Sequence, residues 1–245
     1  MKSVTRAFAL VELFATHATP LNVTDAARMM DIPISTCFNL MRALLEAGYL
    51  YEVNKKCFYP TSRLLEQAQV ISESDPIRAM VKPLLIMLRD QTQETIMLTK
   101  RAGDRALILD VVMGPQTIRY TANVGDFRPL YNSAMGKALL GSLSEEVRLK
   151  TVSTLKFRPV TKKTLTNVKA LLKDIEEGVK RGWFSTEGEG VIDVMSIARP
   201  LVIGGSSYAI AVAGPLERMR PMQRQIAVKL VTVCERARKL SCPDM

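Results

Sequence analysis

The first sixty residues constrain the fold more than any other part of the chain. Apolar residues recur at helical spacing over residues 3–16, over a shorter stretch at 22–30, and over 33–50, PISTCFNLMRALLEAGYL. Two short apolar and aromatic runs within 49–59 then flank a basic turn, which is the pattern of a β-hairpin. The order helix, helix, turn, helix, hairpin predicts a winged helix-turn-helix domain.

Local signals mark the ends of these helices. Asn22 is expected to cap the second helix, with Asp25 completing a variant of the capping box. Pro33 is expected in the first turn of the third helix, where its missing N–H costs little, and Gly48 ends that helix. These boundaries make the third helix a separate amphipathic element.

The third helix has two faces. Its predicted core face is apolar and consists of Ile34, Phe38, Met41, Leu44 and Leu45. Its predicted exposed face is polar and consists of Ser35, Thr36, Asn39, Arg42 and Glu46. In a winged helix-turn-helix such a helix enters the major groove, and the hairpin, here tipped by Lys55 and Lys56, reaches neighbouring phosphates. A small helical subdomain that does not bind DNA, with lysines merely exposed, is the alternative.

The distribution of charge does not identify a DNA-binding surface. The net charge of +10 suggests an acidic partner such as nucleic acid. Residues 1–72, however, contain seven Lys or Arg and six Asp or Glu, a net charge of +1, whereas residues 148–181 contain ten basic and three acidic residues. We interpret this basic segment as a solvated loop and helix.

After residue 93 the pattern changes from helical to strand-like, which indicates a second domain. Strands are expected at 95–101, 105–112, 116–122, 195–203 and 208–215. Helices are expected over 61–73 as a connector, over 77–93 with a break or kink at Pro83, around 133–143, after a cap at Thr166, and at the C-terminus. We therefore predict a mixed α+β fold with an antiparallel sheet and helices on at least one face.

The predicted organisation has three parts. They are a winged helix-turn-helix domain at 1–60, a helical connector at 61–76 and a sheet-containing domain at 77–245.

Several other classes of protein are disfavoured. No apolar stretch reaches the roughly 18 residues that a membrane-spanning helix needs, and Arg6 and Glu12 interrupt the N-terminal apolar run, so neither a membrane protein nor a signal peptide is expected. The four cysteines lack CxxC spacing and His17 is the only histidine, so we expect reduced thiols in a cytoplasmic protein without a metal or cofactor. GxSxG, HExxH and P-loop motifs are absent from the sequence, which disfavours an enzyme.

Five segments, in order, resemble the IclR family of bacterial transcriptional regulators. They are RAFALVELFA, IPISTCFNLMRALLEAGYL, YNSAMGKALLG, the RPVTKKT run followed by a helix ending in RGW, and IARPLVIGGSSYAIAVAGP. The resemblance spans nearly the whole chain. It implies a winged helix-turn-helix followed by a GAF-like domain that binds a small effector, frequently a carboxylate or an aromatic acid. It also implies homodimers that often pair into tetramers, bind double-stranded DNA and switch a catabolic operon.

The resemblance assigns DNA-binding roles residue by residue. Ser35 and Thr36 match the family's Ser-Thr pair at the start of the recognition helix, where hydroxyls and helix N–H groups suit a phosphate. Arg42 matches a position that is often basic, whereas Ile34 stands where the family commonly has Lys or Arg. The family commonly has Arg where Asn39 stands. Since Asn contacts adenine and Arg prefers guanine, a different operator preference is expected, unless Asn39 contacts only backbone or water.

The expected effector site lies around PLYNSAMGKALLG. Small residues at this helix start expose N–H groups that, with the helix dipole, favour a carboxylate near Ala134 and Met135. Alternatively, the small residues only allow close packing of the helix on the sheet. Together with positions added by the resemblance, the expected effector-contacting residues are Leu130, Ser133, Ala134, Met135, Gly136, Glu187, Ser196, Ala211 and Ala213.

Two alanines bear on the chemistry of the effector. Ala211 and Ala213 stand where some family members have ligand-binding serines, and strand alternation places both on one face. The lost hydroxyls make the pocket more apolar, which favours an aromatic or longer acid. Arg119 is either a counter-charge for that acid or a solvent-exposed side chain.

The sequence therefore favours a sequence-specific DNA-binding regulator of a catabolic operon, controlled by a small organic acid. A sensor or assembly module without DNA binding is the alternative, because the N-terminal domain is nearly neutral, and an enzyme is less favoured.

Overall fold

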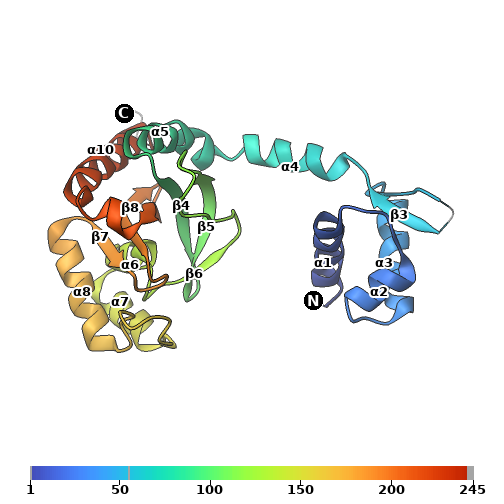
Figure 1. Ribbon diagram of the computed structural model, residues 1–245, viewed down its shortest axis with the longest axis horizontal. Helices are drawn as coiled ribbons and strands as arrows, with labels where there is room; N and C mark the ends of the chain where they lie inside the picture. Colours follow the sequence, from blue (N-terminus) through green and yellow to red (C-terminus); the bar gives the residue numbers. More distant parts are fainter. Residues whose placement is uncertain (1, 55, 242–245) are drawn as a thin grey trace. The chain divides into compact units, whose positions relative to one another are not determined.

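The chain forms two compact units, Met1–Asp75 and Pro76–Met245, which we call the N-terminal unit and the C-terminal unit (Figure 1). The computed structural model describes residues 2–54 and 56–241. Within these residues, no helix combines the length and apolar character needed to cross a membrane.

The N-terminal unit has the element order of a winged helix-turn-helix. Its elements are α1 (Lys2–His17), β1 (Leu21–Asn22), α2 (Val23–Met29), α3 (Ile34–Glu46), β2 (Leu50–Glu52), β3 (Cys57–Pro60) and α4 (Arg63–Glu73). The short strand β1, which the sequence pattern did not indicate, joins the hairpin in an antiparallel sheet of order β1-β3-β2. Lys55, at the predicted hairpin tip, lies outside the described residues.

The predicted cap of α2 is confirmed. Asn22 Oδ1 accepts a hydrogen bond from the backbone N–H of Asp25, and Asn22 Nδ2 donates to Asp25 Oδ2, both at 2.8 Å. Pro33 lies one position earlier than expected. It is the N-cap of α3, and its carbonyl accepts the Cys37 N–H at 3.1 Å.

The buried stripe of α3 differs from the predicted one. Cys37 and Met41 are buried in the core of the unit, whereas Ile34 and Phe38 have 56% and 48% of their surface exposed. Positions 37, 41 and 44 have the same helical spacing as 34, 38 and 41. Spacing alone therefore could not decide which stripe packs inward.

The C-terminal unit is a six-stranded antiparallel sheet with helices on both faces (Figure 1). Its elements are α5 (Pro76–Thr92), β4 (Thr95–Ala102), β5 (Arg105–Val112), β6 (Phe127–Pro129), α6 (Ala134–Gly141), α7 (Glu145–Ser153), α8 (Val168–Arg181), β7 (Phe184–Glu187), β8 (Val194–Ile203), β9 (Ser206–Pro215), α9 (Leu216–Met219) and α10 (Gln223–Ser241). The strand order is β6-β5-β4-β9-β8-β7. One core lies between the sheet and α5 with α10, and the other between the sheet and α6 with α8. The predicted mixed α+β fold class is confirmed.

Three local expectations for this unit need correction. Residues 116–122 form a loop instead of a strand, because β6 takes the edge position beside β5. Pro83 does not break α5; Pro83 and Ala79, whose carbonyl loses its helical donor, are both exposed to water. Asn167, instead of Thr166, caps α8, since its Oδ1 accepts the Ala170 N–H at 2.8 Å.

Gly178, inside α8, packs directly against Phe184, and a Cβ at this glycine would overlap the aromatic ring. Alanine normally stabilises a helix interior relative to glycine by about 1 kcal/mol. Here we expect Gly178→Ala to lower the free energy of unfolding of the C-terminal unit by about 1–3 kcal/mol, because the ring must move. Urea denaturation followed by fluorescence of Trp183, the only tryptophan, measures the change.

The double variant Gly178→Ala with Phe184→Leu should recover part of this loss, because the smaller side chain leaves room for the methyl group. A Gly178→Ala protein as stable as the parent would contradict the close packing.

Candidate functional sites: a recognition helix and an apolar cavity

The start of α3 offers backbone donors to an anion. No side chain among the described residues caps this helix, and its first turn contains no acidic residue. The first N–H groups of a helix have no acceptor within the helix, so they and the helix dipole are available to a phosphate. Ser35 is exposed and Thr36 half-buried at this end. The geometry therefore permits the phosphate contact that the sequence predicted.

The exposed face of α3 combines polar and apolar groups. Asn39 is exposed, and Arg42 pairs with Glu46 at 3.1 Å on the surface. Because such a pair contributes only about 0.2–0.5 kcal/mol, Arg42 can exchange it for a phosphate or a base. Ile34 and Phe38 lie on the same exposed face and could contact thymine methyl groups. Their apolar side chains at helical spacing had instead predicted core positions for both.

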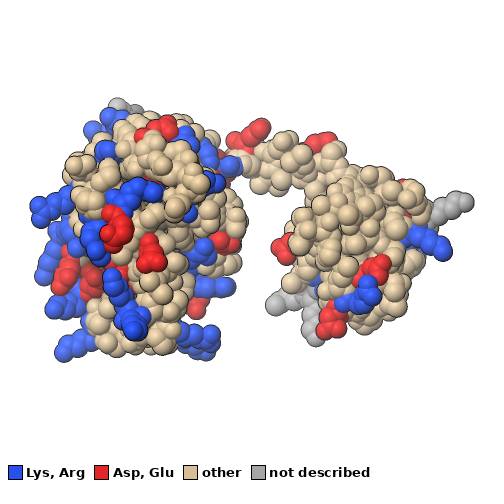
Figure 2. All heavy atoms as spheres, viewed as in Figure 1, with Lys and Arg blue, Asp and Glu red and all other residues tan. Residues whose placement is uncertain are grey.

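The hairpin adds little charge that can be located. Lys56 is exposed. Figure 2 shows Lys and Arg side chains spread over the C-terminal unit and few on the visible face of the N-terminal unit. DNA recognition by the N-terminal unit would therefore depend on particular contacts of α3 more than on a strong positive field.

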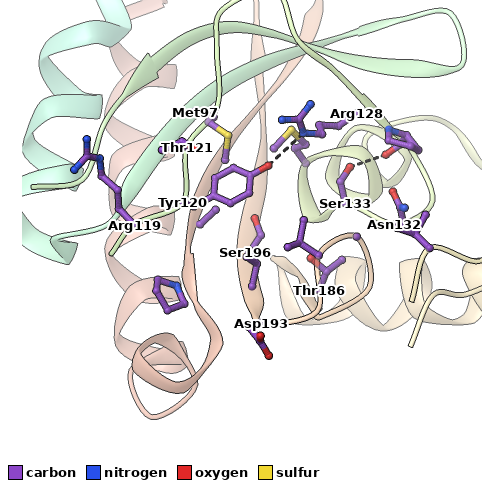
Figure 3. Close-up of a pocket in the computed structure, with 18 of the residues that line it drawn as sticks. Met97, Arg119, Tyr120, Thr121, Arg128, Asn132, Ser133, Thr186, Asp193 and Ser196 are labelled. Atoms are coloured by element: carbon purple, nitrogen blue, oxygen red, sulfur yellow. Dashed lines mark hydrogen bonds between the residues drawn. The ribbon is translucent and has the colours of Figure 1, made fainter. Parts of the chain in front are cut away.

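The C-terminal unit contains a cavity of about 740 Å³ (Figure 3). Apolar groups form much of its wall, including Met97, Ile118, Phe127, Met135, Val160, Val191, Val194 and Ala213. Polar groups converge on it from several elements, namely Arg119, Tyr120, Thr121, Arg128, Asn132, Ser133, Thr186, Asp193 and Ser196. A mostly apolar cavity of this size with a few polar groups is typical of a small-molecule site.

Four of the nine predicted effector-contacting residues line the cavity, namely Ser133, Met135, Ser196 and Ala213. The other five lie elsewhere. Four of them are buried in the core, namely Leu130, Ala134, Gly136 and Ala211, and Glu187 forms an ion pair with Arg220 at 3.1 Å. Gly136 serves close packing, since a Cβ there would meet the Leu130 backbone oxygen at 2.5 Å. For Gly136, the packing alternative is the one that the geometry supports.

Ser133 has its hydroxyl already engaged. The Oγ donates to the Pro129 carbonyl at 2.6 Å and accepts the Gly136 N–H at 3.2 Å, which makes Ser133 the N-cap of α6. Its contribution to the cavity is therefore shape and the position of the helix start, not a spare hydrogen-bond donor.

Ser196 has the opposite character. It is 8% exposed, lines the cavity from β8, and its Oγ has no hydrogen-bond partner within the described part of the chain. A buried hydroxyl without a partner costs about 1–3 kcal/mol, which a polar group of a ligand would relieve. Figure 3 shows Ser196, Thr186 and Tyr120 around the same space.

Two side chains place polar groups at the cavity wall: Arg128 contributes a guanidinium and Tyr120 a phenol. Arg128 Nε donates to Tyr120 Oη at 3.2 Å, and its Nη2 lies 3.2 Å from Asp126 Oδ2. Burial alone would lower the pKa of Arg128, but Tyr120 and Asp126 outweigh burial and raise it. Arg119 is exposed, donates to the Gln116 carbonyl at 3.0 Å, and points away from the middle of the cavity (Figure 3). Arg128 is therefore the better-placed counter-charge.

Four further polar residues line the cavity that the sequence pattern did not indicate, namely Tyr120, Arg128, Asn132 and Asp193. The expected strand at 116–122 would have placed Tyr120 in a sheet, and no local spacing linked residues 118–128 to the start of α6. Residues 118–124, IRYTANV, alternate apolar and polar side chains as a strand does, so the local pattern favoured a strand and gave no signal for the loop.

A buried ion cluster fixes one side of the cavity. Lys137, fully buried in α6, lies 2.7 Å from Glu189 Oε1 and 2.8 Å from Asp174 Oδ2. Burial raises the pKa of Glu189, and Lys137 opposes that rise. The Glu189 carbonyl also accepts from Thr164 Oγ1 at 2.7 Å. Because Gly190 follows directly and lines the cavity, the cluster positions this part of the wall.

Comparison with known proteins relates both units to one family. The family model of the IclR helix-turn-helix domain matches residues 3–53, and that of the bacterial transcriptional regulator IclR C-terminal domain matches residues 68–242. The HTH-type transcriptional repressor AllR of Escherichia coli strain K12 is 25% identical over 228 residues, covering 89% of this chain and 82% of AllR. AllR of Salmonella typhimurium strain LT2 is 26% identical over 228 residues, covering 89% and 81%.

Solved structures show the same fold. The IclR of Thermotoga maritima has a TM-score of 0.83 at 23% identity, covering 98% of this chain and 99% of that protein. An IclR homolog from Microbacterium hydrocarbonoxydans, complexed with 4-hydroxybenzoate, has a TM-score of 0.73 at 22% identity, covering 95% and 99%.

Replacing Lys137 should reveal the buried cluster. Lys137→Met leaves the Glu189 carboxylate buried without its closest counter-ion, so we expect the free energy of unfolding near pH 7 to fall by about 3–5 kcal/mol. The pKa of Glu189 should rise further. A carboxyl whose folded-state pKa lies above its unfolded value adds stability at low pH that is lost as pH rises. The loss should therefore be smaller at about pH 5 than at about pH 7.5.

Urea denaturation at the two pH values measures this difference. Lys173→Met, at an exposed position of α8, is the matched control and should change stability little at either pH. An equal loss for Lys137→Met at both pH values would show that Glu189 does not titrate as described.

Proposed function

The chain belongs to the IclR family of bacterial transcriptional regulators, matched over residues 3–53 and 68–242, and from this premise we propose that a small organic acid in the cavity controls its affinity for an operator of a catabolic operon. The observation that carries the proposal is the buried, unpartnered hydroxyl of Ser196 inside a cavity of about 740 Å³. Such a group favours a ligand that brings its own hydrogen-bonding atom.

We propose that the effector combines an apolar body with an acidic group. The apolar wall supports a flat or extended hydrocarbon part. Arg128 and the N-terminus of α6 supply favourable charge for a carboxylate, and Ser196 accepts or donates a hydrogen bond. Ala213, which lines the cavity, adds no hydroxyl to the wall, and this favours an aromatic or longer acid; Ala211 does not line the cavity. The 4-hydroxybenzoate held by the Microbacterium hydrocarbonoxydans homolog belongs to this chemical class.

For DNA, we propose that α3 is the recognition helix. Its free N-terminal N–H groups, with Ser35 and Thr36, bind a phosphate, and Asn39 reads a base edge, as bidentate Asn contacts to adenine do. Arg42 and Lys56 add phosphate contacts. A sensor without DNA binding remains the alternative outcome of the DNA experiment.

Assembly and location stay predictions. We propose that the chain acts as a homodimer or tetramer in the cytoplasm. Symmetric pairs of helix-turn-helix domains read two half-sites one helical turn apart, and the exposed Val4 and Phe8 of α1 offer apolar surface for such an assembly.

The effector proposal predicts specific stabilisation by acids. A thermal-shift screen of the full chain should include 4-hydroxybenzoate, other aromatic acids, aliphatic acids of matching length and the uncharged amides of each. A binding acid at about 100 times its Kd adds roughly 2.7 kcal/mol to the stability of the C-terminal unit, and its amide adds less.

Variants assign that stabilisation to the cavity. Ser196→Ala should weaken binding of the acid by about 3- to 10-fold, in line with one lost hydrogen bond. Ser153→Ala removes an exposed hydroxyl of α7 and should leave binding unchanged. Stabilisation by amides as strong as by acids would count against an acidic effector, and an unchanged affinity in Ser196→Ala would remove Ser196 from the site.

The DNA proposal predicts three separable effects. Selection from random duplexes first gives the preferred sequence of the parent protein. Asn39→Ala should then lose about 1–3 kcal/mol of discrimination at one base pair. Arg42→Ala should weaken binding to the preferred duplex. Lys56→Ala should weaken binding to all duplexes equally and lower the magnitude of the slope of log K against log salt by about one. Binding titrations at several salt concentrations measure these changes.

Lys180→Ala, an exposed lysine of α8, serves as the control for loss of a positive charge. If no duplex is enriched by the parent protein, the sensor without DNA binding is the better description. If discrimination survives Asn39→Ala, that residue does not read a base.

A further inference from the structure

Glu94 and Arg218 form a charged pair at the junction of α5 and β4. Glu94 lies between the two elements and is 2% exposed. Arg218, in α9, donates through Nε to Glu94 Oε1 at 2.5 Å and through Nη2 to Oε2 at 2.9 Å. This is the two-pronged geometry that fixes an arginine most firmly. The hydrogen bond with Glu94 raises the pKa of Arg218.

The chain is shaped closely around this carboxylate. A Cβ at Gly214, in β9, would collide with Glu94 Oε2, and a Cβ at Gly114 would lie 2.9 Å from the Glu94 carbonyl carbon. Glycine is therefore needed on both sides. Gln93, directly before Glu94, has a φ of 59°, a conformation that a residue with a side chain rarely adopts. The end of α5 is thus held in one defined position relative to the sheet.

The same arginine also holds the cavity wall. Arg218 Nη2 donates to the Ile118 carbonyl at 3.0 Å, and Thr95 Oγ1, at the start of β4, donates to the Tyr120 carbonyl at 2.5 Å. Ile118 and Tyr120 both line the cavity. Residues 118–121 are therefore held in place by hydrogen bonds from the side chains of Thr95 and Arg218. They form no strand, so backbone hydrogen bonds to a neighbouring strand do not hold them.

The helix that carries Arg218 belongs to the core that surrounds α5. Leu216 and Met219, on either side of Arg218 in α9, are buried in the same cluster as Val81 and Leu85 of α5. A displacement of Arg218 would therefore change the contacts of α5, both at the ion pair with Glu94 and in this core. Within the chain, α5 is the first element after the N-terminal unit.

We propose that Arg218 couples occupancy of the cavity to the end of α5. Its guanidinium joins the wall carbonyl of Ile118 to the Glu94 carboxylate, and its backbone belongs to α9, whose Leu216 and Met219 enter the core around α5. An occupant that pushes residues 118–121 outward changes the Ile118 contact, and Arg218 must shift or release one of its bonds to Glu94. Arg218 is thus a positioning residue, and the proposal rests on the proposed function only in that the cavity takes a ligand.

A tethered occupant tests the coupling without knowledge of the effector. Ser196→Cys is placed in a full-length chain that also carries Cys57→Ser and Cys242→Ser, and is labelled with benzyl methanethiosulfonate. Burial raises the pKa of the Cys37 thiol and, for Cys234, raises it to about 12, so both should stay unlabelled, as mass spectrometry verifies. Hydrogen exchange of the labelled and unlabelled proteins is then compared peptide by peptide.

In the chain that carries only these three cysteine substitutions, the benzyl group should alter exchange by about threefold or more both at 115–121 and at 88–95, which spans the end of α5 and the junction with β4. Arg218→Lys keeps a positive charge but loses the fork that bonds Glu94 and Ile118 together. In this variant the change at 115–121 should persist while the change at 88–95 falls below about a third of its original size.

Arg220→Lys is the matched control, because Arg220 follows in the same short segment and pairs with Glu187 on the surface. In the Arg220→Lys variant, labelling should change hydrogen exchange at 88–95 as much as it does in the labelled chain with arginine at 220. If Arg218→Lys does not fold, Glu94→Gln gives the same test, since it weakens the pair from the other side and retains an oxygen acceptor.

The proposal is overturned if Arg218→Lys or Glu94→Gln transmits the change to 88–95 undiminished. It is also overturned if the benzyl group leaves 115–121 unaltered in the parent, because the wall would then not respond to occupancy. Neither DNA nor a free acid is used, so failure of operator recognition or of the acid screen would appear in those experiments and not in this one.

Discussion

The alternation of small and large side chains along β9 is the constraint on which the C-terminal unit depends. One face of this strand is small and enters the core with α6, namely Ala209, Ala211 and Ala213. The other face is large and enters the core with α5 and α10, namely Tyr208, Ile210 and Val212. Protein interiors are close-packed, so the alanine row lets α6 lie near the sheet over part of its length. The cavity lies beside the end of this row, since Ala213 lines it and Ala211 does not.

Sequence reasoning succeeded where one face of an element is apolar and failed where side chains hold the backbone. The periodicity predicted β4, β5, β8 and β9 and the longer helices that pack on them, since burial imposes that pattern, but it did not predict β6 or β7. It did not predict α7, which buries only Val152, or the loop at 116–122. That loop has a strand-like composition, but its backbone is bonded by Thr95 and Arg218 from distant parts of the chain. Long-range contacts of this kind leave no local pattern.

The candidate sites show the same division. The motif around Ser133 correctly indicated the start of α6, yet the small residues after it serve packing, and Ser196 became a strong candidate only when its hydroxyl proved buried and unpartnered. On α3, helical spacing was compatible with two different buried stripes. The difference decides whether Ile34 and Phe38 stabilise the core or face a partner, and only the packing of Cys37 and Met41 resolves it.

The way the cavity wall is held determines how a ligand can act. Displacing a sheet strand breaks a whole ladder of backbone bonds, whereas residues 118–121 depend on a few side-chain anchors from Thr95, Arg218 and Arg128. Each such bond contributes about 0.5–3 kcal/mol net, so shifting one or two costs roughly as much as the 1–3 kcal/mol of a typical allosteric coupling. A ligand shifts an equilibrium only by its difference in affinity for the two states. A wall of this stiffness would let the proposed ligand supply that difference without unfolding the sheet.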